Sequence, residues 1–274
     1  MLSKISKPLP YIALILAHTI WGMHFVVSKI TLQEFPPFTL AFLRFSFACL
    51  FLIPFFLIHK KKVKIKLKHL PKLTLVGIFI IALNIAFFFT GIQRTDAISA
   101  SVITLIIPIL SVILGWAFLK EKVFLINLLG VIFGLFGALV IIGVPEILIG
   151  NFEPISLLGN FLVLLASVSF VIGAIFSRQM LKIYPSLVVT SFAFLVGVIT
   201  FFPLAVFEYM QNPAWVEKLT TLGVFGLVFM TLLSSISAYF LFEWGLAKTS
   251  VGKADLFQYI EPLEIGRASC RERV

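Results

Sequence analysis

Long apolar segments alternate with short polar ones along almost the whole chain. An α-helix needs about 20 apolar residues to cross the roughly 30 Å hydrocarbon layer of a bilayer. Eight segments reach this length and a ninth begins near Gly252; the eight cover residues 10–28, 37–58, 73–92, 97–119, 125–144, 156–176, 187–207 and 222–246. The pattern predicts an all-α polytopic membrane protein in which short connections make consecutive helices pack antiparallel.

Composition supports this fold class. Of 274 residues, 60% are hydrophobic and 12% are charged, whereas soluble domains are nearer half apolar and a quarter charged. The first apolar segment follows Lys4 and Lys7, as a signal peptide would. It lacks a small-x-small cleavage site and leads into further spans, so we expect a retained first helix. The cysteines, Cys49 and Cys270, indicate neither a disulfide framework nor a metal site.

The net charge of +10 is distributed unevenly between the two sets of loops. Loops on the side of the N-terminus hold fifteen cations, namely Lys4, Lys7, Lys60, Lys61, Lys62, Lys64, Lys66, Lys68, Lys72, Lys120, Lys122, Arg178, Lys182, Lys248 and Lys253. Loops on the opposite side hold only Lys29, Arg94 and Lys218. The positive-inside rule therefore predicts a cytoplasmic N-terminus. The basic loop is interpreted as an anchor near anionic lipid and not as a nucleic-acid site, because no aromatic residues are interleaved with its lysines.

Two parts of the chain resemble each other. "GIQRTDAISASVITLIIPIL" and "GLAKTSVGKADLFQYIEPL" match at a spacing of 154 through Gly91/Gly245, Thr95/Thr249, Ala100/Ala254 and Pro108/Pro262. Earlier segments match at a spacing of 149 through Ala17/Ala166, Ser28/Ser177, Lys29/Arg178, Pro36/Pro185 and Pro54/Pro203. Five predicted helices separate equivalent positions, and an odd number inverts the second copy. The sequence therefore predicts an inverted repeat of two five-helix halves, as in many secondary transporters.

Several stretches resemble one known family when they are taken together with this duplication. "TIWGMHFVVSK", "LAFLRFSFA", "GWAFLKEK" and "LLGVIFGLFGALVI" follow one another as in the EamA-type branch of the drug/metabolite transporter superfamily. The resemblance extends from Tyr11 to Leu263. It implies a ten-helix carrier that imports or exports small metabolites, with a central cavity lined by its first, third, fourth, sixth, eighth and ninth helices. We assign residues 1–145 to the first repeat and 146–263 to a second, incomplete one.

The last eleven residues, 264–274, break this pattern. The repeat spacing aligns them with the apolar "SVILGWAFLKE", yet they contain Arg267, Arg271, Glu272 and Arg273. Each such charge costs a few kcal/mol at the centre of a bilayer. Codon for codon, these residues also resemble the translation of a common sequencing-adapter read. We expect this tail to be foreign and the natural protein to continue through a complete ninth and a tenth helix.

Arg44 is a permanent cation within the apolar segment 37–58. A guanidinium near the bilayer centre costs at least about 3 kcal/mol, so it usually faces protein or water. Two interpretations remain open: Arg44 faces the bundle and holds an anionic substrate group or a carboxylate, or its side chain extends toward the interface or binds a carbonyl at a helix end. The second repeat has Ala193 at the equivalent position. Arg44 is therefore not a packing requirement of both halves.

Further candidates are polar groups set in apolar helices. Trp21 and His24 share one face of the first helix, where they either meet a substrate or serve packing and a buried hydrogen bond; His18, six residues before His24, is left out. Asn84 lies in the third helix. Polar stripes recur in two others, with Ser101 and Thr104 before Pro108, and Asp255, Gln258 and Tyr259 before Pro262. A cavity wall explains such stripes better than hydrogen bonds between helices, although both remain open.

The helix at 222–246 contributes Tyr239 and Glu243. Glu243 is interpreted either as a carboxylate that balances Lys248 or Lys253 at the interface, or as a proton-coupling group. Gly130 and Gly134 form a small-xxx-small seam that predicts helix packing.

No motif indicates an enzyme, a metal site or a cofactor. The predicted function is a secondary active transporter that moves a small metabolite, amino acid-like or otherwise polar or amphipathic, across the cytoplasmic membrane by alternating access. Its expected partners are this solute and the lipid bilayer, with no nucleic acid; a homodimer is left open. The alternatives are a cationic drug exporter, for which a membrane-buried carboxylate would dominate, and a non-transporting membrane scaffold or sensor.

Overall fold

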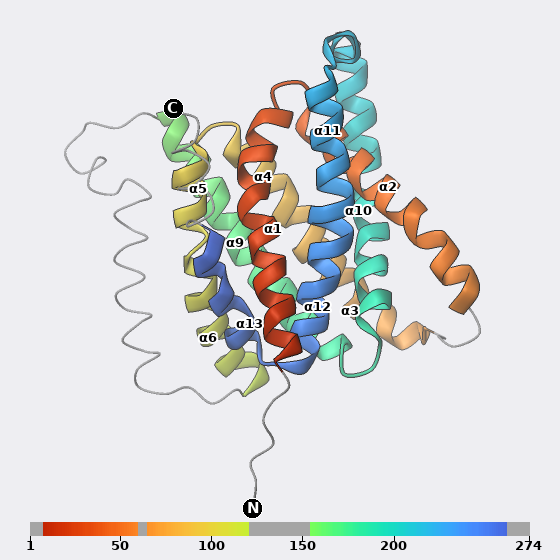
Figure 1. Ribbon diagram of the computed structural model, residues 1–274, viewed down its shortest axis with the longest axis vertical. Coiled ribbons are helices and arrows are strands. Elements are labelled where there is room, and N and C mark those ends of the chain that lie inside the picture. The colour runs from red at the N-terminus through yellow and green to blue at the C-terminus, as the bar shows by residue number, and fades with distance from the viewer. Residues whose placement is uncertain (1–7, 60–64, 121–153, 262–274) are drawn as a thin grey trace, which may run out of the picture.

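The computed structural model describes residues 8–59, 65–120 and 154–261, and these ranges contain helices and short connections without a strand (Figure 1). The elements of the first half are α1 (Leu9–Thr31), α2 (Pro37–His59), η1 (Leu67–His69), α3 (Leu70–Val76), η2 (Gly77–Leu83), α4 (Asn84–Ile92), α5 (Ala97–Ile103) and α6 (Ile106–Leu119). Those of the second half are α9 (Pro154–Met180), α10 (Ser186–Gln211), η3 (Pro213–Lys218), α11 (Thr221–Phe229), η4 (Met230–Ser237), α12 (Ala238–Lys248), α13 (Val251–Asp255) and η5 (Leu256–Ile260).

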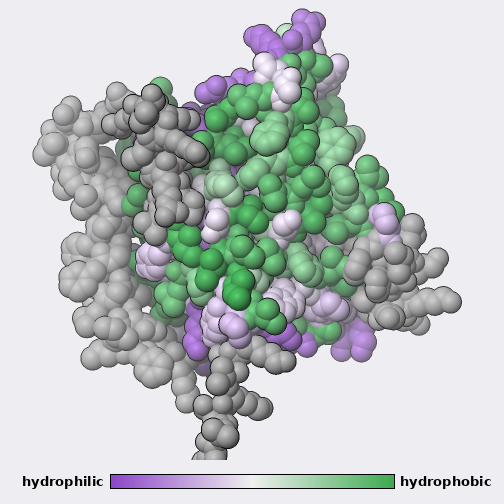
Figure 2. Space-filling view, in the orientation of Figure 1, coloured by the Kyte–Doolittle hydropathy of each residue, from purple (hydrophilic) through white to green (hydrophobic). Residues whose placement is uncertain are grey.

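Seven helices in the described ranges are long and apolar enough to cross a membrane. They confirm the predicted all-α polytopic fold. Figure 2 shows an apolar band between two polar ends, as a bilayer requires. The predicted helix at 125–144 with its seam of Gly130 and Gly134, most of the lysine run and the tail 264–274 lie outside the described residues.

The helices pack as two related sets. The second helices of the halves, α2 and α10, pack against each other, and the fourth span of the first half meets its counterpart in the second through a contact of α6 with α13. Likewise α4 packs on α9 of the other half, and α12 packs on α1. Each of these contacts therefore either joins equivalent helices or is matched by a second contact between the equivalent helices, as α4–α9 is matched by α12–α1. This pattern, together with the antiparallel path of the chain, confirms the two repeated halves.

Both halves contain a wide, π-helical turn at the same place. These turns, η2 and η4, are separated by 153 residues at their first positions and by 154 at their last, which is the spacing of the repeat. A π-helical turn bonds i to i+5 and commonly occurs at functional sites. Here η4 presents the Ser234 carbonyl to Trp21 and the Ser235 hydroxyl to Arg44.

Pro108 interrupts the helix that the sequence predicts over 97–119. Proline has no N–H, so it cannot bond the carbonyl of Thr104, four residues earlier. Instead the Ile107 N–H donates to that carbonyl at 2.9 Å, and α5 and α6 meet at a short break. In the second half, α13 ends at Asp255 and a tighter 3-10 turn, η5, follows. Both breaks lie beside the centre of the bundle.

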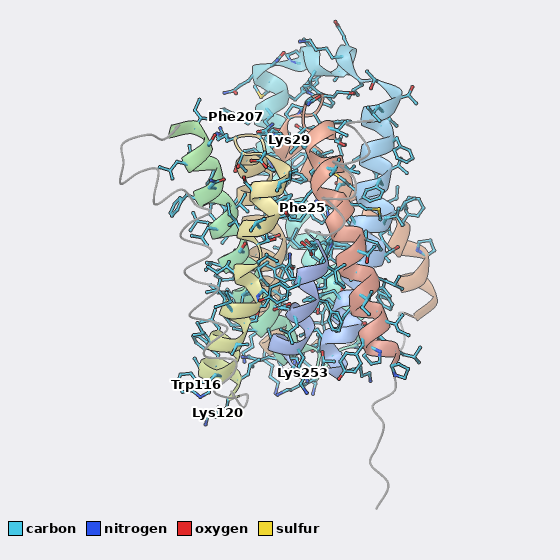
Figure 3. All side chains as sticks on the ribbon, turned by 60° about the vertical axis from the view of Figure 1, so that its left-hand side comes forward. Phe25, Lys29, Trp116, Lys120, Phe207 and Lys253 are labelled. Atoms are coloured by element: carbon cyan, nitrogen blue, oxygen red, sulfur yellow. The ribbon has the colours of Figure 1, made fainter. Side chains whose placement is uncertain are left out.

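Carboxylates join the two halves at the end of the bundle that holds Lys29 (Figure 3). Glu208 of α10 accepts hydrogen bonds from the backbone N–H of Phe38 (3.1 Å) and of Thr39 (2.7 Å) at the start of α2. Glu34 accepts from the hydroxyl and the N–H of Thr220 at the start of α11, and these bonds lower the pKa of the Glu34 carboxyl. Each carboxylate thus satisfies N–H groups at the start of a helix of the other half.

Candidate functional site

A cavity lies among helices of both halves. Figure 3 places Phe25, one of its wall residues, between Lys29 at one end of the bundle and Lys120 and Lys253 at the other. The wall consists of Trp21, His24, Phe25, Arg44, Asn84, Ile85, Phe88, Thr104, Ile107, Phe170, Tyr239, Gln258 and Glu261.

Much of this wall comes in equivalent pairs. Four pairs of lining residues match at the spacings of the repeat, 149 for the first pair and 154 for the others: Trp21/Phe170, Ile85/Tyr239, Thr104/Gln258 and Ile107/Glu261. Two of the pairs are in direct contact. The rings of Trp21 and Phe170 meet edge to face with centroids 5.8 Å apart, and Gln258 Nε2 donates to Thr104 Oγ1 at 3.1 Å. The cavity therefore lies on the pseudo-twofold axis that relates the halves.

The ionisable groups of the wall do not follow this symmetry. Arg44 and His24 belong to the first half, where the second has Ala193 and Gly173. Glu261 belongs to the second half, and its counterpart in the first is Ile107. The wall thus places its cation in one half and its carboxylate in the other.

Arg44 faces the bundle and is only 1% exposed. Its Nε donates to Ser235 Oγ at 2.7 Å, and its Nη1 lies 3.4 Å from His24 Nε2. The guanidinium carbon is also 4.9 Å from the ring centre of Phe45 and 5.9 Å from that of Phe89, within reach of cation–π attraction. None of these four partners carries a charge when His24 Nε2 accepts a hydrogen bond from Arg44 Nη1. The alternative in which Arg44 extends toward the interface is wrong.

Aromatic side chains surround the polar groups. His24 stacks on Phe88 with centroids 5.7 Å apart, and Ser28 Oγ lies within hydrogen-bonding distance of the imidazole nitrogens of His24. Trp21 donates from Nε1 to the Ser234 carbonyl at 3.2 Å and meets the Tyr239 ring at 5.1 Å. These hydrogen bonds use the edges of the rings and leave the ring faces apolar. The wall therefore combines apolar ring faces with the charged groups Arg44 and Glu261.

Glu261 is held by two neutral donors. His18 Nδ1 lies 2.9 Å from Glu261 Oε1, and Gln258 Nε2 donates to Glu261 Oε2. Both members of the His18–Glu261 pair are buried. His18 Nε2 has no hydrogen-bond partner among the described residues, and a protonated Nε2 would bury an unpaired N–H. The geometry therefore fits the tautomer that carries its proton on Nδ1, with Glu261 as the carboxylate.

Seven of the eleven residues predicted from the sequence line this cavity: Trp21, His24, Arg44, Asn84, Thr104, Tyr239 and Gln258. Asn84 also donates to the Ala166 carbonyl at 3.0 Å, so it both lines the cavity and joins two helices.

The other four predicted residues lie elsewhere. Ser101 donates to the Ile98 carbonyl in its own helix, Asp255 accepts from Ser111 Oγ, and Glu243 accepts from Ser177 Oγ. Glu243 is buried, and no ion pair joins it to Lys248 or Lys253. Tyr259 is 49% exposed. The predicted stripe assumed α-helical winding, whereas η5 has three residues per turn. Gln258, three residues after Asp255, therefore stays on the same face of the helix, and Tyr259 lies on a different face.

The sequence analysis missed His18 and Glu261. His18 was left out because it lies six residues before His24 and so does not share its face. It lies only three residues before Trp21, however, and the two rings meet edge to face with centroids 5.4 Å apart. Glu261 could have been found from the repeat, because it is a charged residue at the position equivalent to the apolar Ile107.

Comparison with known proteins identifies the family of the chain. The sequence profile of the EamA-like transporter family matches residues 8–143 and 157–266. The chain belongs to the EamA-like transporter family. A solved crystal structure with 16% identity superposes with a TM-score of 0.65 and covers 96% of this chain and 86% of that one, which shows a shared fold.

Relatives with curated names are named as transporters or as an efflux pump. "Uncharacterized transporter YoaV" of Bacillus subtilis (strain 168) is 25% identical, over 89% of this chain and 82% of the relative. An "Uncharacterized transporter" of Archaeoglobus fulgidus is 27% identical, over 92% and 86%. The "Probable amino-acid metabolite efflux pump" of Escherichia coli (strain K12) is 26% identical, over 92% and 80%. The chain is therefore a multi-pass membrane protein of a transporter family.

Proposed function

We propose that the protein is a secondary carrier that moves a small metabolite across the cell membrane by alternating access. The observation that carries this proposal is the position of the cavity, which lies on the axis between two inverted halves and is walled by equivalent residues of both. In such carriers the halves rock about a site on this axis and open it first to one side and then to the other. The repeats 1–145 and 146–263 are the proposed moving bodies.

The chemistry of the wall supports a small organic solute. It combines aromatic rings with a few directed polar groups, as small-molecule sites do. A relative is named as a probable amino-acid metabolite efflux pump, which fits an amino acid-like solute. A cationic drug exporter is less well supported, because a buried carboxylate does not dominate the wall: Glu261 shares it with the cation Arg44.

Flux measurements test this proposal. The purified chain, reconstituted in proteoliposomes, should carry out saturable uptake of some member of a metabolite panel, and preloading with unlabelled solute should accelerate entry of the labelled one. A carrier that returns loaded shows this acceleration, whereas a channel does not. Failure to move any solute, with the protein correctly inserted, would favour the scaffold or sensor.

Transport should also depend on the wall. Tyr239→Ala and Trp21→Ala enlarge the cavity and should weaken apparent affinity for the solute by about tenfold or more, since aromatic anchors commonly contribute 2 kcal/mol or more. Trp116→Ala is a matched control, because Trp116 is exposed among the described residues and does not line the cavity.

A further inference from the structure

The cavity wall contains two opposite charges that do not pair with each other. Arg44 comes from α2 and Glu261 from the end of the second half, and both are buried. In the part of the chain that the structure describes, the Glu261 carboxylate lies 2.9 Å from Nδ1 of His18, which is neutral in the tautomer described above, and no ion pair joins Glu261 to Arg44. A buried charge without an opposite charge costs several kcal/mol. A solute that brings the complementary charge would therefore stabilise both Arg44 and Glu261.

Arg44 retains donors for an anion. The Nε and Nη1 atoms have partners, and the described residues offer no further hydrogen-bond acceptor and no carboxylate to the guanidinium. A guanidinium has five N–H donors in a planar fork that matches a carboxylate in two parallel bonds. The bond from Nε to Ser235 and the rings of Phe45 and Phe89 hold this plane in place. Arg44 thus has the geometry to receive a carboxylate.

Glu261 retains acceptor positions for a cation. A carboxylate has about four lone-pair positions, and His18 and Gln258 use one on each oxygen. Both donors are neutral in the tautomer described above, so they orient the carboxylate without neutralising its charge. An ammonium group in the cavity would supply both the positive charge and the additional donors.

We propose that the cavity binds a small zwitterion with an apolar side chain, an α-amino acid or a close relative. The carboxylate binds Arg44, the ammonium binds Glu261, and the apolar side chain lies among Trp21, Phe88 and Phe170. This proposal rests on the proposed function, because it identifies the solute of the same cavity. The asymmetry of the wall supports it, since each of the two charges is present in one half and has an apolar residue, Ala193 or Ile107, at the equivalent position of the other.

The rival explanation is purely structural. In it, Arg44 and Glu261 attract each other across the cavity and only stabilise the fold. The two explanations differ in what a neutralised pair should do. If the charges serve only each other, the double variant Arg44→Gln/Glu261→Gln should regain the transport and stability that either single variant loses.

Analogues on the unmodified chain give the first test. Labelled L-phenylalanine uptake into proteoliposomes is competed by L-leucine, by 3-phenylpropanoate, which lacks the ammonium, and by 2-phenylethylamine, which lacks the carboxylate. In parallel, the same four compounds are tested for raising the melting temperature of the detergent-purified chain, since a ligand that binds the folded state stabilises it. Both amino acids should bind, and both analogues should bind about 100-fold more weakly, as expected when a site's polar group is left unpaired.

Variants give the second test. Arg44→Gln should bind 2-phenylethylamine nearly as well as phenylalanine, and Glu261→Gln should do the same for 3-phenylpropanoate. The double variant should lose discrimination against both analogues. Arg94→Gln is the control, because Arg94 is outside the cavity and donates to the Thr90 carbonyl of the preceding helix, α4. Size-exclusion profiles identify variants that fail to fold, and for those the analogue panel on the unmodified chain decides.

The outcomes separate the two proposals. Saturable flux together with equal affinity of the chain for the amino acids and for both analogues overturns the zwitterion site and leaves the carrier intact. Full recovery of transport and stability in the double variant does the same. Thermal stabilisation by amino acids but not by the analogues, without flux of any solute, supports the zwitterion site and overturns the carrier. Absence of both flux and stabilisation overturns both proposals.

Discussion

Thr104 and Gln258 occupy equivalent positions in the two halves and are joined by a hydrogen bond of 3.1 Å. The bond crosses the pseudo-twofold axis beside the two helix breaks. Because Gln258 also donates to Glu261, this residue links the axis to the carboxylate of the cavity.

A double-mutant cycle should detect this bond. Thr104→Val and Gln258→Leu each remove one partner, and we expect a coupling energy of about 0.5–2 kcal/mol, the range of interhelical hydrogen bonds in membranes. The free energy of unfolding in mixed micelles is the measurement. Gln258→Leu also removes the bond to Glu261, but that loss appears in the double variant too and cancels in the cycle. Strictly additive losses would show that the contact contributes nothing.

Glu208 should stabilise the start of α2 from the other half. Glu208→Ala leaves the N–H groups of Phe38 and Thr39 without their acceptor, so we expect a loss of about 1–2 kcal/mol, as for other helix caps. The melting temperature of the purified chain reports this loss. Glu217→Ala removes an exposed carboxylate in η3, after the end of α10, and should leave the melting temperature unchanged. Equal effects of both substitutions would refute the cap.

Gly173 allows α9 to approach η2. A Cβ at this position would lie 2.7 Å from the backbone nitrogen of Ile80, which cannot move without displacing the helix. We expect Gly173→Ala to cost about 1–3 kcal/mol. At Gly252 the nearest atom to an added Cβ is a methyl group of Val112 at 3.3 Å, so Gly252→Ala should be nearly neutral. Thermal unfolding of both variants decides, and comparable losses would contradict the prediction.

Cysteine labelling tests the orientation of the chain. Lys120 and Lys253 lie at one end of the bundle, opposite Lys29 (Figure 3), and the distribution of loop cations predicts that this end is cytoplasmic. In a background with Cys49 and Cys270 replaced by serine, Lys120→Cys and Lys253→Cys should react with an impermeant maleimide only after the cells are permeabilised. Lys218→Cys should react in intact cells. The reverse pattern would invert the predicted topology.

The features that follow from period and spacing were accessible from the sequence. The apolar segments predicted the spans, and the match of residues 154 apart predicted the repeat. Details that depend on local winding were not accessible in the same way. Tyr259 was misplaced because η5 is wound more tightly than an α-helix, and the wide turns η2 and η4 have no obvious local sequence pattern.

Charged positions illustrate the same division. Arg44 was conspicuous because a cation is rare in an apolar segment, but its partners Ser235 and His24 come from other helices and depend on packing. The link between His18 and Glu261 spans 243 residues of sequence. Nothing in the pattern around either residue predicts such a contact, although the repeat alignment does mark Glu261 as different from Ile107.

A wall composed only of identical pairs would hold any solute in two poses of equal energy, related by a half-turn. None of the four pairs that line the wall is identical, and in Arg44/Ala193, His24/Gly173 and Glu261/Ile107 only one half carries an ionisable group. These differences between the halves remove the degeneracy and give the cavity one preferred orientation for its occupant.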